Sequence, residues 1–435
     1  MDNFVSMPKY ETYRNSNIQW IGEIPTKWNL KKAKWLFYKV ERKPLVNDEI
    51  VTCFRDGQVT LRKNRRIEGF TNALKEHGYQ RICKGDLVIH AMDAFAGAIG
   101  VSDSDGKSTP VYAACIPRKK GTINSYYYAY YMRNLALSGF IESLAKGIRE
   151  RSTDFRFNDF AELVLPFPNY KEQTLIANFL DIKTSQIDET ISIKQQQINL
   201  LKERKKIIIQ KAVTQGLNPN VPMRNSGVDW IGKFPEHWQL KRLKYVTKIV
   251  KRIIGYEGPD VLSITKKGIK IKDIESGEGQ LAMDYSKYQI VKIGDFAMNH
   301  MDLLTGYVDI SKHEGVVSPD YRVFINTFDG LEDEFLLSIF QLGYQQKIFY
   351  RYGQGVSFLG RWRFPAESFN NFYIPIPPND EQISIVKHVK AEWDKLDKAI
   401  DLLASQIGKM KEYKTALIDS AVTGKIKIVP EMMEQ

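Results

Sequence analysis

The chain contains few cysteines and histidines and no long apolar run. Its 435 residues include only Cys53, Cys83 and Cys115, together with six scattered histidines. This pattern predicts neither a disulfide scaffold nor a metal site, and it fits a reducing compartment. No run reaches the roughly 18 apolar residues of a membrane span, and no secretory pattern opens the chain. We therefore expect a cytoplasmic protein.

Acidic residues are fewer than basic ones. The chain has 63 Lys and Arg residues against 51 Asp and Glu, a net charge of +12. Such an excess favours a polyanionic partner such as nucleic acid, although a soluble protein that is merely basic remains an alternative. At roughly 100–200 residues per domain the length predicts two or three domains.

Two halves of the chain carry the same motifs. Trp-Ile-Gly-Glu-Ile-Pro-Thr-Lys-Trp at residues 20–28 returns at 230–238 as Trp-Ile-Gly-Lys-Phe-Pro-Glu-His-Trp, an offset of 210. At an offset of 209 the chain repeats Gly85-Asp86, Met92-Asp93, Glu172-Gln173 and Ala212-Val213-Thr214. An offset that holds over most of the chain predicts two copies of one structural unit.

The sequence of each copy predicts an α/β (α+β) unit of about 165 residues. Short apolar runs between Gly, Asp and Pro are typical of strands, and such runs occupy residues 87–89, 112–116, 261–264 and 321–325. Aromatic amphipathic stretches at 126–143 and 332–350 predict helices. Pro-bearing strands at 163–168 and 373–378 close the two units.

Long helical segments follow the closing strands. Residues 169–215 lack Pro and Gly, and residues 379–423 contain only Gly408. Alternating spacings of four and three predict a coiled-coil seam. Its members are Ile187, Ile191, Lys194, Ile198, Leu201, Lys205, Ile208 and Ala212, and then Leu396, Ile400, Leu403, Ile407, Met410, Lys414, Leu417 and Ala421. The alternative is that each helix packs separately on its own domain.

The length of the segment that connects the two halves favours an antiparallel helix pair. Residues 184–214 would span about 45 Å as a helix, and a parallel pair would require residues 217–229 to cover nearly that length while fully extended. An antiparallel pair instead places one reading unit at each end, related by a pseudo-two-fold axis. That symmetry matches duplex DNA, and it predicts a split recognition site with an unread spacer.

Catalytic motifs are not recognisable in the sequence. Residues 100–108 resemble a phosphate-binding loop, but five residues separate the glycines where four are required, so we expect a turn between strands. The recurring Asp86, Asp93, Asp295 and Asp302 are more simply turn residues than a carboxylate site. We therefore predict a protein without catalytic machinery or bound metal.

Clusters of cationic and amide side chains near glycines are candidates for DNA contact, because such donors reach base edges and phosphates. Their alternative is a solvated charged surface. The candidates are Gln58, Arg62, Lys63, Arg65, Arg66, Arg149, Arg151 and Arg156 in the first copy, and Lys266, Lys267, Lys270, Lys272, Gln354, Ser357, Arg361 and Arg363 in the second.

The paired Trp-Ile-Gly openings, Glu-Gln junctions and Ala-Val-Thr helix endings resemble the DNA-specificity subunit of type I restriction–modification systems along the whole chain. The resemblance implies target recognition domains at 1–168 and 217–378 and helical spacer regions at 169–216 and 379–435. It also implies two methyltransferase subunits as partners, motor-nuclease subunits in a larger complex, and S-adenosylmethionine and ATP bound by those partners. Outer helix residues are candidate partner contacts, with packing on the chain's own domains as the alternative: Leu175, Ile176, Phe179, Ile383, Ile385 and Val386.

Two other classes remain open: a free-standing nuclease or methyltransferase, and an RNA-binding or scaffolding repeat protein. If the resemblance holds, the two half-sites should differ, because residues 40–81 and 247–290 have little similarity. We therefore expect an asymmetric, bipartite DNA motif.

Overall fold

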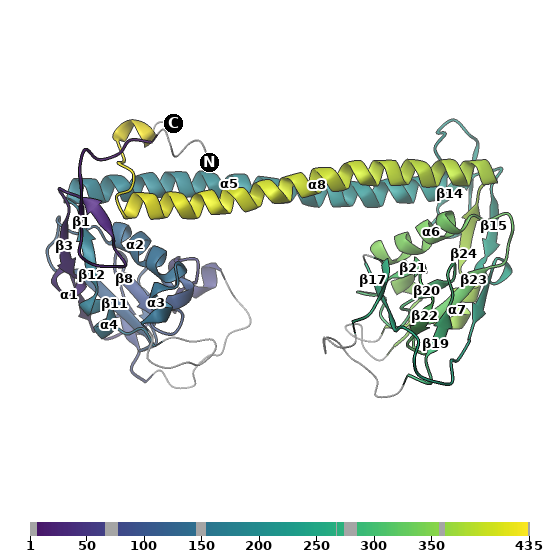
Figure 1. Ribbon diagram of the computed structural model, residues 1–435, viewed down its shortest axis with the longest axis horizontal. Helices are drawn as coiled ribbons and strands as arrows, with labels where there is room; N and C mark the ends of the chain where they lie inside the picture. The colour runs from purple at the N-terminus through teal and green to yellow at the C-terminus, as the bar shows by residue number, and fades with distance from the viewer. Residues whose placement is uncertain are drawn as a thin grey trace. The chain divides into compact units, whose positions relative to one another are not determined.

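The computed structural model describes residues 7–65, 77–144, 154–266, 268–273, 285–355 and 362–433 (Figure 1). The chain divides into two compact units, unit 1 (residues 1–194 and 405–435) and unit 2 (residues 195–404). Both are mixed α/β structures in which the paired strands run antiparallel. Within the described ranges, no helix combines the length and apolarity needed to cross a membrane.

Unit 1 is built around a four-stranded sheet in the order β4-β11-β8-β9, with smaller pairs β1-β2, β3-β12, β5-β6 and β7-β10. The strands are β1 (Tyr13–Asn15), β2 (Glu23–Pro25), β3 (Asn29–Lys32), β4 (Phe37–Val40), β5 (Val51–Cys53), β6 (Val59–Leu61), β7 (Gln80–Ile82), β8 (Leu87–His90), β9 (Ile99–Val101), β10 (Gly106–Ser108), β11 (Tyr112–Pro117) and β12 (Val164–Phe167). The short helices are α1 (Ala33–Leu36), η2 (Arg62–Asn64), η3 (Ala94–Ala96), α2 (Ser125–Leu137), α3 (Phe140–Ser143), α4 (Phe157–Glu162) and, in the C-terminal tail, η6 (Pro430–Met433).

Unit 2 has the same strand order. Its four-stranded sheet runs β16-β23-β20-β21, and the pairs are β13-β14, β15-β24, β17-β18 and β19-β22. The strands are β13 (Met223–Asn225), β14 (Lys233–Pro235), β15 (Gln239–Arg242), β16 (Thr247–Val250), β17 (Leu262–Thr265), β18 (Gly268–Ile271), β19 (Gln289–Val291), β20 (Phe296–Met298), β21 (Val308–Ile310), β22 (Gly315–Val317), β23 (Arg322–Asn326) and β24 (Tyr373–Ile376). The short helices are η4 (Leu243–Tyr245), α6 (Asp333–Gln345), η5 (Phe349–Tyr352) and α7 (Ala366–Asn371).

One amphipathic helix covers the main sheet of each unit. Asn124 caps α2 by accepting hydrogen bonds from the backbone N–H groups of Tyr126 and Tyr127. The helix then buries Tyr127, Tyr128 and Tyr131 in the core of unit 1. In unit 2, α6 buries Phe335 and Phe340 in the same way. These elements confirm the helices predicted at 126–143 and 332–350, each of which ends earlier than its pattern suggested.

The Trp-Ile-Gly motif forms a turn that supports a long helix end. Gly22 and Gly232 have φ of 71° and 66°, a left-handed conformation that favours glycine. The motif then places Trp28 and Trp238 in the cores. Each tryptophan contacts the glycine that ends a long helix: a Cβ on Gly424 would lie 2.9 Å from the Trp28 ring, and one on Gly216 would lie 3.0 Å from Trp238. The repeated motif is therefore a helix support.

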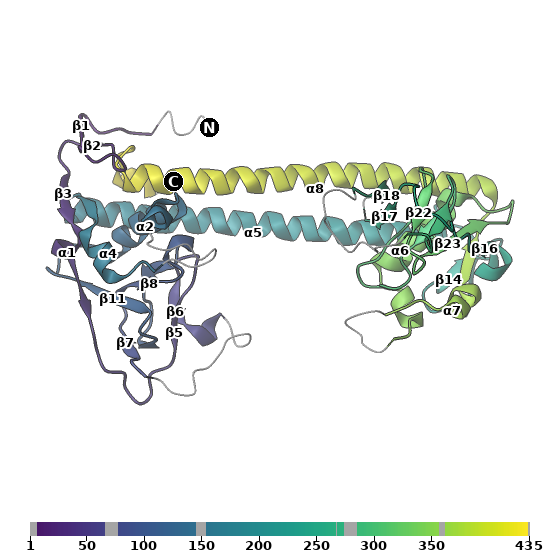
Figure 2. The same cartoon turned by 60° about the horizontal axis from the view of Figure 1, so that its bottom comes forward.

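The long helices are α5 (Tyr170–Gln215) and α8 (Asn379–Val422), and each contributes one part to each unit (Figures 1 and 2). In unit 1, Lys414 pairs with Asp188 at 2.6 Å and Lys194 donates to Gln406 at 2.8 Å, so the helices run antiparallel there. In unit 2, Lys205 pairs with Asp397 at 2.7 Å and Trp393 donates to the backbone oxygen of Lys205. The two ion pairs join equivalent positions, 209 residues apart.

The predicted seam residues lie on the sheltered side of the helices. Ile187, Ile198, Leu396, Ile407 and Leu417 are buried. The remaining apolar members are buried or half-buried as well: Ile191, Leu201, Ile208, Ala212, Ile400, Leu403, Met410 and Ala421. The half-buried Lys205 and Lys414 pair with aspartates of the facing helix, as described above.

The starts of the long helices are anchored in the units. Gln173 is fully buried; its amide donates to the backbone oxygens of Thr122 and Pro168 and accepts from the Asn124 backbone N–H. Gln382 makes the equivalent contacts with Gly330, Pro377 and Glu332. These contacts account for the glutamine of the repeated Glu-Gln junction.

The proposed outer helix contacts divide into two groups. Ile176 and Phe179 are buried in the core of unit 1, and Ile385 is buried in the core of unit 2. Leu175 and Val386 pack partly against the same cores. For these five residues the structure therefore favours the alternative, packing on the chain's own units, whereas Ile383 is exposed.

Candidate nucleic-acid interface

The first cationic cluster surrounds η2, which follows the β5-β6 hairpin. Arg65 pairs with Asp56 at 2.6 Å and stacks over Phe54, while Lys63 pairs with Glu49 at 2.5 Å. Arg62 donates to the Thr52 hydroxyl at 3.1 Å. Ion pairs between exposed groups are weak, so these side chains can exchange their carboxylates for phosphates.

A cavity of about 1170 Å³ lies beside this cluster in unit 1. Gln58 lines it together with residues of α2 and of the long helices, including Arg133, Asp188 and Lys414. Burial lowers the pKa of Arg133, and among the described residues its Nε has no hydrogen-bond partner. Gln58 therefore lies beside the long helices of unit 1 as well as beside the cationic cluster.

Arg156 precedes α4 on the same unit. Its side chain is exposed and donates to Asp154 at 2.8 Å, and its backbone N–H donates to Asp159. It lines a small cavity of about 390 Å³ with Lys39, Met92 and Tyr112. The neighbouring candidates Arg149 and Arg151 lie outside the described residues, as do Arg66, Lys267, Ser357 and Arg361.

The second cluster lies on the β17-β18 hairpin of unit 2. Lys266 and Lys270 are exposed, and Lys272 is half-buried. Gln354 and Arg363 lie in a different part of the unit, where their backbones form a two-residue antiparallel bridge. The structure thus brings the lysines together on one hairpin, and the Gln354–Arg363 pair forms a separate group.

A buried polar cluster in unit 2 was not predicted. Arg322 on β23 is 5% exposed, and its Nη2 donates to the backbone oxygen of Phe364 at 2.9 Å. Among the described residues, Arg322 Nη1, His300 Nδ1 and Asn299 Oδ1 have no hydrogen-bond partner. The strand register places Ala113 of unit 1 at the position of Arg322. A single arginine inside the apolar run at 321–325 was the available sequence signal.

This cluster predicts a pH-dependent stability of unit 2. Burial, followed by the charges of Arg322 and Arg363, lowers the pKa of His300 from 6.5 to about 4. The folded state therefore favours the neutral imidazole of His300. The contribution of this group to the free energy of unfolding of unit 2 is complete above pH 6.5 and is lost as the pH falls toward 4. His300→Asn should flatten the pH dependence of unfolding in this window, measured by urea titration. Parallel curves for the variant and the parent would contradict the assignment.

The recurring aspartates have structural roles. Asp86 is buried, accepts from the Cys83 backbone N–H and pairs with Arg42 at 2.5 Å. Asp295 makes the same contacts with Lys292 and Arg252. Asp302 accepts from the N–H groups of Leu304 and Thr305. Within residues 100–108, residues 102–105 form the predicted turn between β9 and β10. The described ranges contain no group of three or more His, Cys, Asp or Glu side chains suited to a metal.

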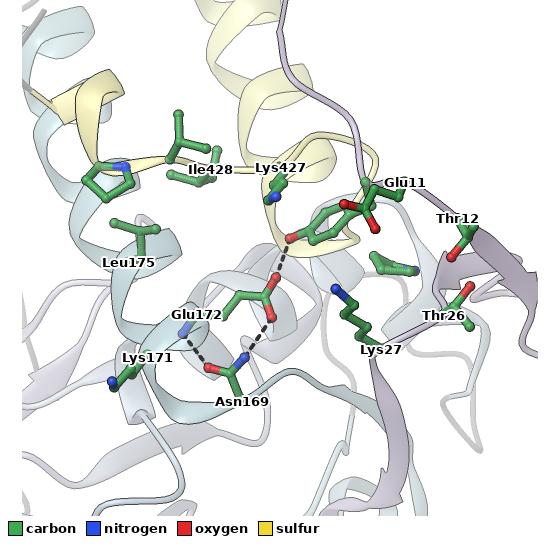
Figure 3. Close-up of a pocket in the computed structure, with 14 residues that line it drawn as sticks. Glu11, Thr12, Thr26, Lys27, Asn169, Lys171, Glu172, Leu175, Lys427 and Ile428 are labelled. Carbon is green, nitrogen blue, oxygen red and sulfur yellow. Dashed lines mark hydrogen bonds between the residues drawn. The ribbon is translucent and has the colours of Figure 1, made fainter.

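A further cavity, of about 450 Å³, lies where both chain ends meet the start of α5 (Figure 3). Tyr10 donates to Glu172 at 2.6 Å, and Asn169 caps the helix by accepting from the Glu172 backbone N–H. The backbone N–H of Lys427 donates to Pro8. In unit 2, Glu381 accepts from Trp238 and His237. The repeated glutamate therefore serves helix anchoring in both units.

Known proteins are similar to this chain in sequence. The putative type I restriction enzyme MjaX specificity subunit of Methanocaldococcus jannaschii is 22% identical over 442 residues, covering 97% of this chain and 98% of the relative. The type I restriction enzyme MjaVIII specificity subunit of the same organism is 25% identical over 331 residues, covering 71% and 72%. The chain is homologous to type I specificity subunits. The resemblance predicted from the paired motifs is thereby confirmed, although no family model matches the chain.

Solved structures share the fold of this chain. A chain from a structure of the complex assembly and conformational transition of the type I R-M system has a TM-score of 0.67 at 14% identity, covering 92% of this chain and 98% of that one. The HsdS subunit from Thermoanaerobacter tengcongensis has a TM-score of 0.50 at 15% identity, covering 93% and 98%. The likeness therefore extends over both units and both long helices.

Proposed function

We propose that this chain is the DNA-specificity subunit of a type I restriction–modification complex and has no catalytic activity of its own. The observation that carries the proposal is that two units of identical strand order present different polar side chains. Unit 1 offers Arg62, Lys63 and Arg65 beside β6, whereas unit 2 offers the lysines of the β17-β18 hairpin. Two units with the same fold but different polar side chains are suited to bind two different DNA half-sites.

The helices supply the second part of the proposal. α5 and α8 form an antiparallel coiled coil that sets the length of the unread spacer between the half-sites. The equivalent pairs Lys205–Asp397 and Lys414–Asp188 support this role. A charged residue at a seam position restricts register, and two such pairs at equivalent positions fix the helices at two places along their length.

The remaining chemistry belongs to partners. Two methyltransferase subunits bind the helices and recognition units and hold S-adenosylmethionine, and motor-nuclease subunits that use ATP join the larger complex. The names of the relatives and the presence of a related chain in a type I R-M assembly support this arrangement. The bound DNA is double-stranded, and its recognition motif is bipartite and asymmetric.

A methylation map tests the proposal. The chain is expressed with the methyltransferase encoded beside it in a methylation-free host, and modified adenines are read genome-wide by single-molecule sequencing. We expect a bipartite, asymmetric motif that depends on this chain. If the two proteins associate but no DNA is methylated, the chain acts as a scaffold. If they do not associate, the proposal is overturned.

The same assay tests the candidate DNA contacts. Replacing Arg62, Lys63 and Arg65 by Ala should weaken recognition of the half-site read by unit 1 at least roughly tenfold, because cationic donors to bases and phosphates are lost. The half-site read by unit 2 should be unchanged. Alanine substitutions at Lys266, Lys270 and Lys272 are the matched set and should have the opposite selectivity. Equal methylation of both half-sites by both variants would show that these clusters are solvated surface charge.

A further inference from the structure

Both units expose an aromatic residue at the same place, next to lysine. Leu-Lys-Lys-Ala-Lys-Trp at residues 30–35 corresponds to Leu-Lys-Arg-Leu-Lys-Tyr at 240–245, an offset of 210. Trp35 is 65% exposed and Tyr245 is 64% exposed. Lys34 lies over the Trp35 ring at 5.9 Å, and Lys244 lies over the Tyr245 ring at 5.0 Å. We name each arrangement the Lys-aromatic surface of its unit.

The backbone holds the two surfaces in equivalent geometry. In unit 1 the Ala33 N–H donates to the Leu163 oxygen at 2.8 Å, where β3 leaves its pairing with β12. In unit 2 the Leu243 N–H donates to the Phe372 oxygen at 2.9 Å, where β15 leaves β24. Ala33 and Leu243 are fully buried. These anchors turn Trp35 and Tyr245 outward, so neither aromatic ring is required by the core.

Further cationic residues lie on β3 and β15, the strands that lead to Trp35 and Tyr245. Lys31 lies over Phe167 and Lys241 lies over Phe328, each at 4.0 Å. In unit 1, Glu162 neutralises part of the charge by accepting from Lys32 and Lys34, each at 2.7 Å. In unit 2 the equivalent position is Asn371, which carries no charge. A matching surface should therefore be acidic, with an apolar recess for the ring.

The Lys-aromatic surfaces lie away from the two hairpin clusters proposed as DNA contacts, whereas the candidates Arg156 and Arg363 shortly precede α4 and α7, which pack against α1 and η4. In unit 1, α1 and the β5-β6 hairpin lie at opposite edges (Figure 2). In unit 2, β16, which directly follows η4, and the β17-β18 hairpin are likewise at opposite edges (Figure 2). Base-reading surfaces must differ between units that read different half-sites. A surface that both units retain therefore suits a ligand that is the same on both sides.

We infer that each Lys-aromatic surface binds one copy of the same protein partner, the methyltransferase subunit, through an acidic face with an apolar recess. This inference rests on the proposed function and assigns part of its docking surface. Tryptophan and tyrosine are among the side chains that concentrate binding energy at protein interfaces. Duplex DNA offers phosphates to the lysines, but it takes up a bulky aromatic ring only where neighbouring base steps are partly unstacked, which costs free energy.

The test uses the full chain with Trp35→Ala, Tyr245→Ala and both together, and Tyr256→Ala as the control. Tyr256 is 62% exposed, and its counterpart in unit 1 is Val46, so it is an exposed aromatic without a repeat. Binding of the methyltransferase subunit is followed by native mass spectrometry and titration calorimetry, and thermal unfolding checks each fold. Each single variant should retain one tight site and weaken the other about tenfold or more. The double variant should weaken both, and Tyr256→Ala and Trp35→Phe should bind like the parent.

The outcomes separate the inference from the function on which it rests. If the parent chain binds no methyltransferase subunit, the proposed function fails. If the parent and the double variant bind two copies with equal affinity, the Lys-aromatic surfaces are not docking sites and the proposed function is unaffected. If the double variant assembles normally but loses DNA affinity with a smaller salt dependence, the surfaces contact the DNA backbone and the inference is overturned.

Discussion

Removing one heptad from each long helix should shorten the spacer between the methylated half-sites by about three base pairs while leaving both half-sites unchanged. The deletions are residues 191–197 in α5 and 400–406 in α8. Seven residues correspond to about 10 Å of helix, and DNA rises about 3.4 Å per base pair. Genome-wide methylation mapping of the variant measures the spacer directly.

The ion pairs explain why the two deletions must be made together. On α5, Asp188 precedes the deleted segment and Lys205 follows it; on α8, Asp397 precedes and Lys414 follows. Paired deletions preserve both Lys–Asp contacts and the seam spacing. A deletion in α5 alone would leave Lys205 one heptad out of register with Asp397 while Asp188 still faces Lys414. We expect that single deletion to abolish methylation. An unchanged spacer in the double deletion would refute the helices as the ruler.

The parts of the molecule that depend on sequence periodicity were predictable. The heptads predicted long helices with a sheltered seam, because a spacing of four and three places residues on one side of a helix. The partners of the repeated motifs were not predictable in the same way. Gly424 contacts Trp28 although nearly 400 residues separate them, and sequence spacing does not say which helix end meets which tryptophan.

Other features could not be found by comparing the two halves of the sequence. The Lys-aromatic surfaces escaped a comparison of identical residues, because Lys32 is replaced by Arg242 and Trp35 by Tyr245. Arg322 was missed for another reason. In a strand-like run, an arginine side chain is expected on the solvent-facing side of the strand. In the structure it is buried against Phe364 and Phe369. The counter-ions of the cationic cluster, Glu49 and Asp56, could not be paired without the β5-β6 register.

Gln173→Ala should destabilise unit 1 by about 3–5 kcal/mol, and Gln382→Ala should destabilise unit 2 by a similar amount. Each substitution leaves one backbone N–H and two backbone carbonyl groups without their partner, one carbonyl in a buried hydrogen bond and the other two groups in part-buried ones. A buried group left unpaired costs about 1–3 kcal/mol. Hydrogen exchange monitored by mass spectrometry resolves the two units. Loss of protection should centre on the start of α5 for Gln173→Ala and on the start of α8 for Gln382→Ala. Gln186→Ala, at an exposed site on α5, is the control.

The glutamine variants also separate the length of the ruler from its stiffness. Gln173 fixes α5 to the connection between β11 and α2, so its loss loosens the joint while the helix length stays the same. At a temperature where unit 1 remains folded, the variant should methylate sites with a wider range of spacer lengths centred on the original value. The paired heptad deletion should instead move the centre and keep the range narrow. If Gln173→Ala loses exchange protection but keeps a single spacer length, spacing is set by a contact other than this joint.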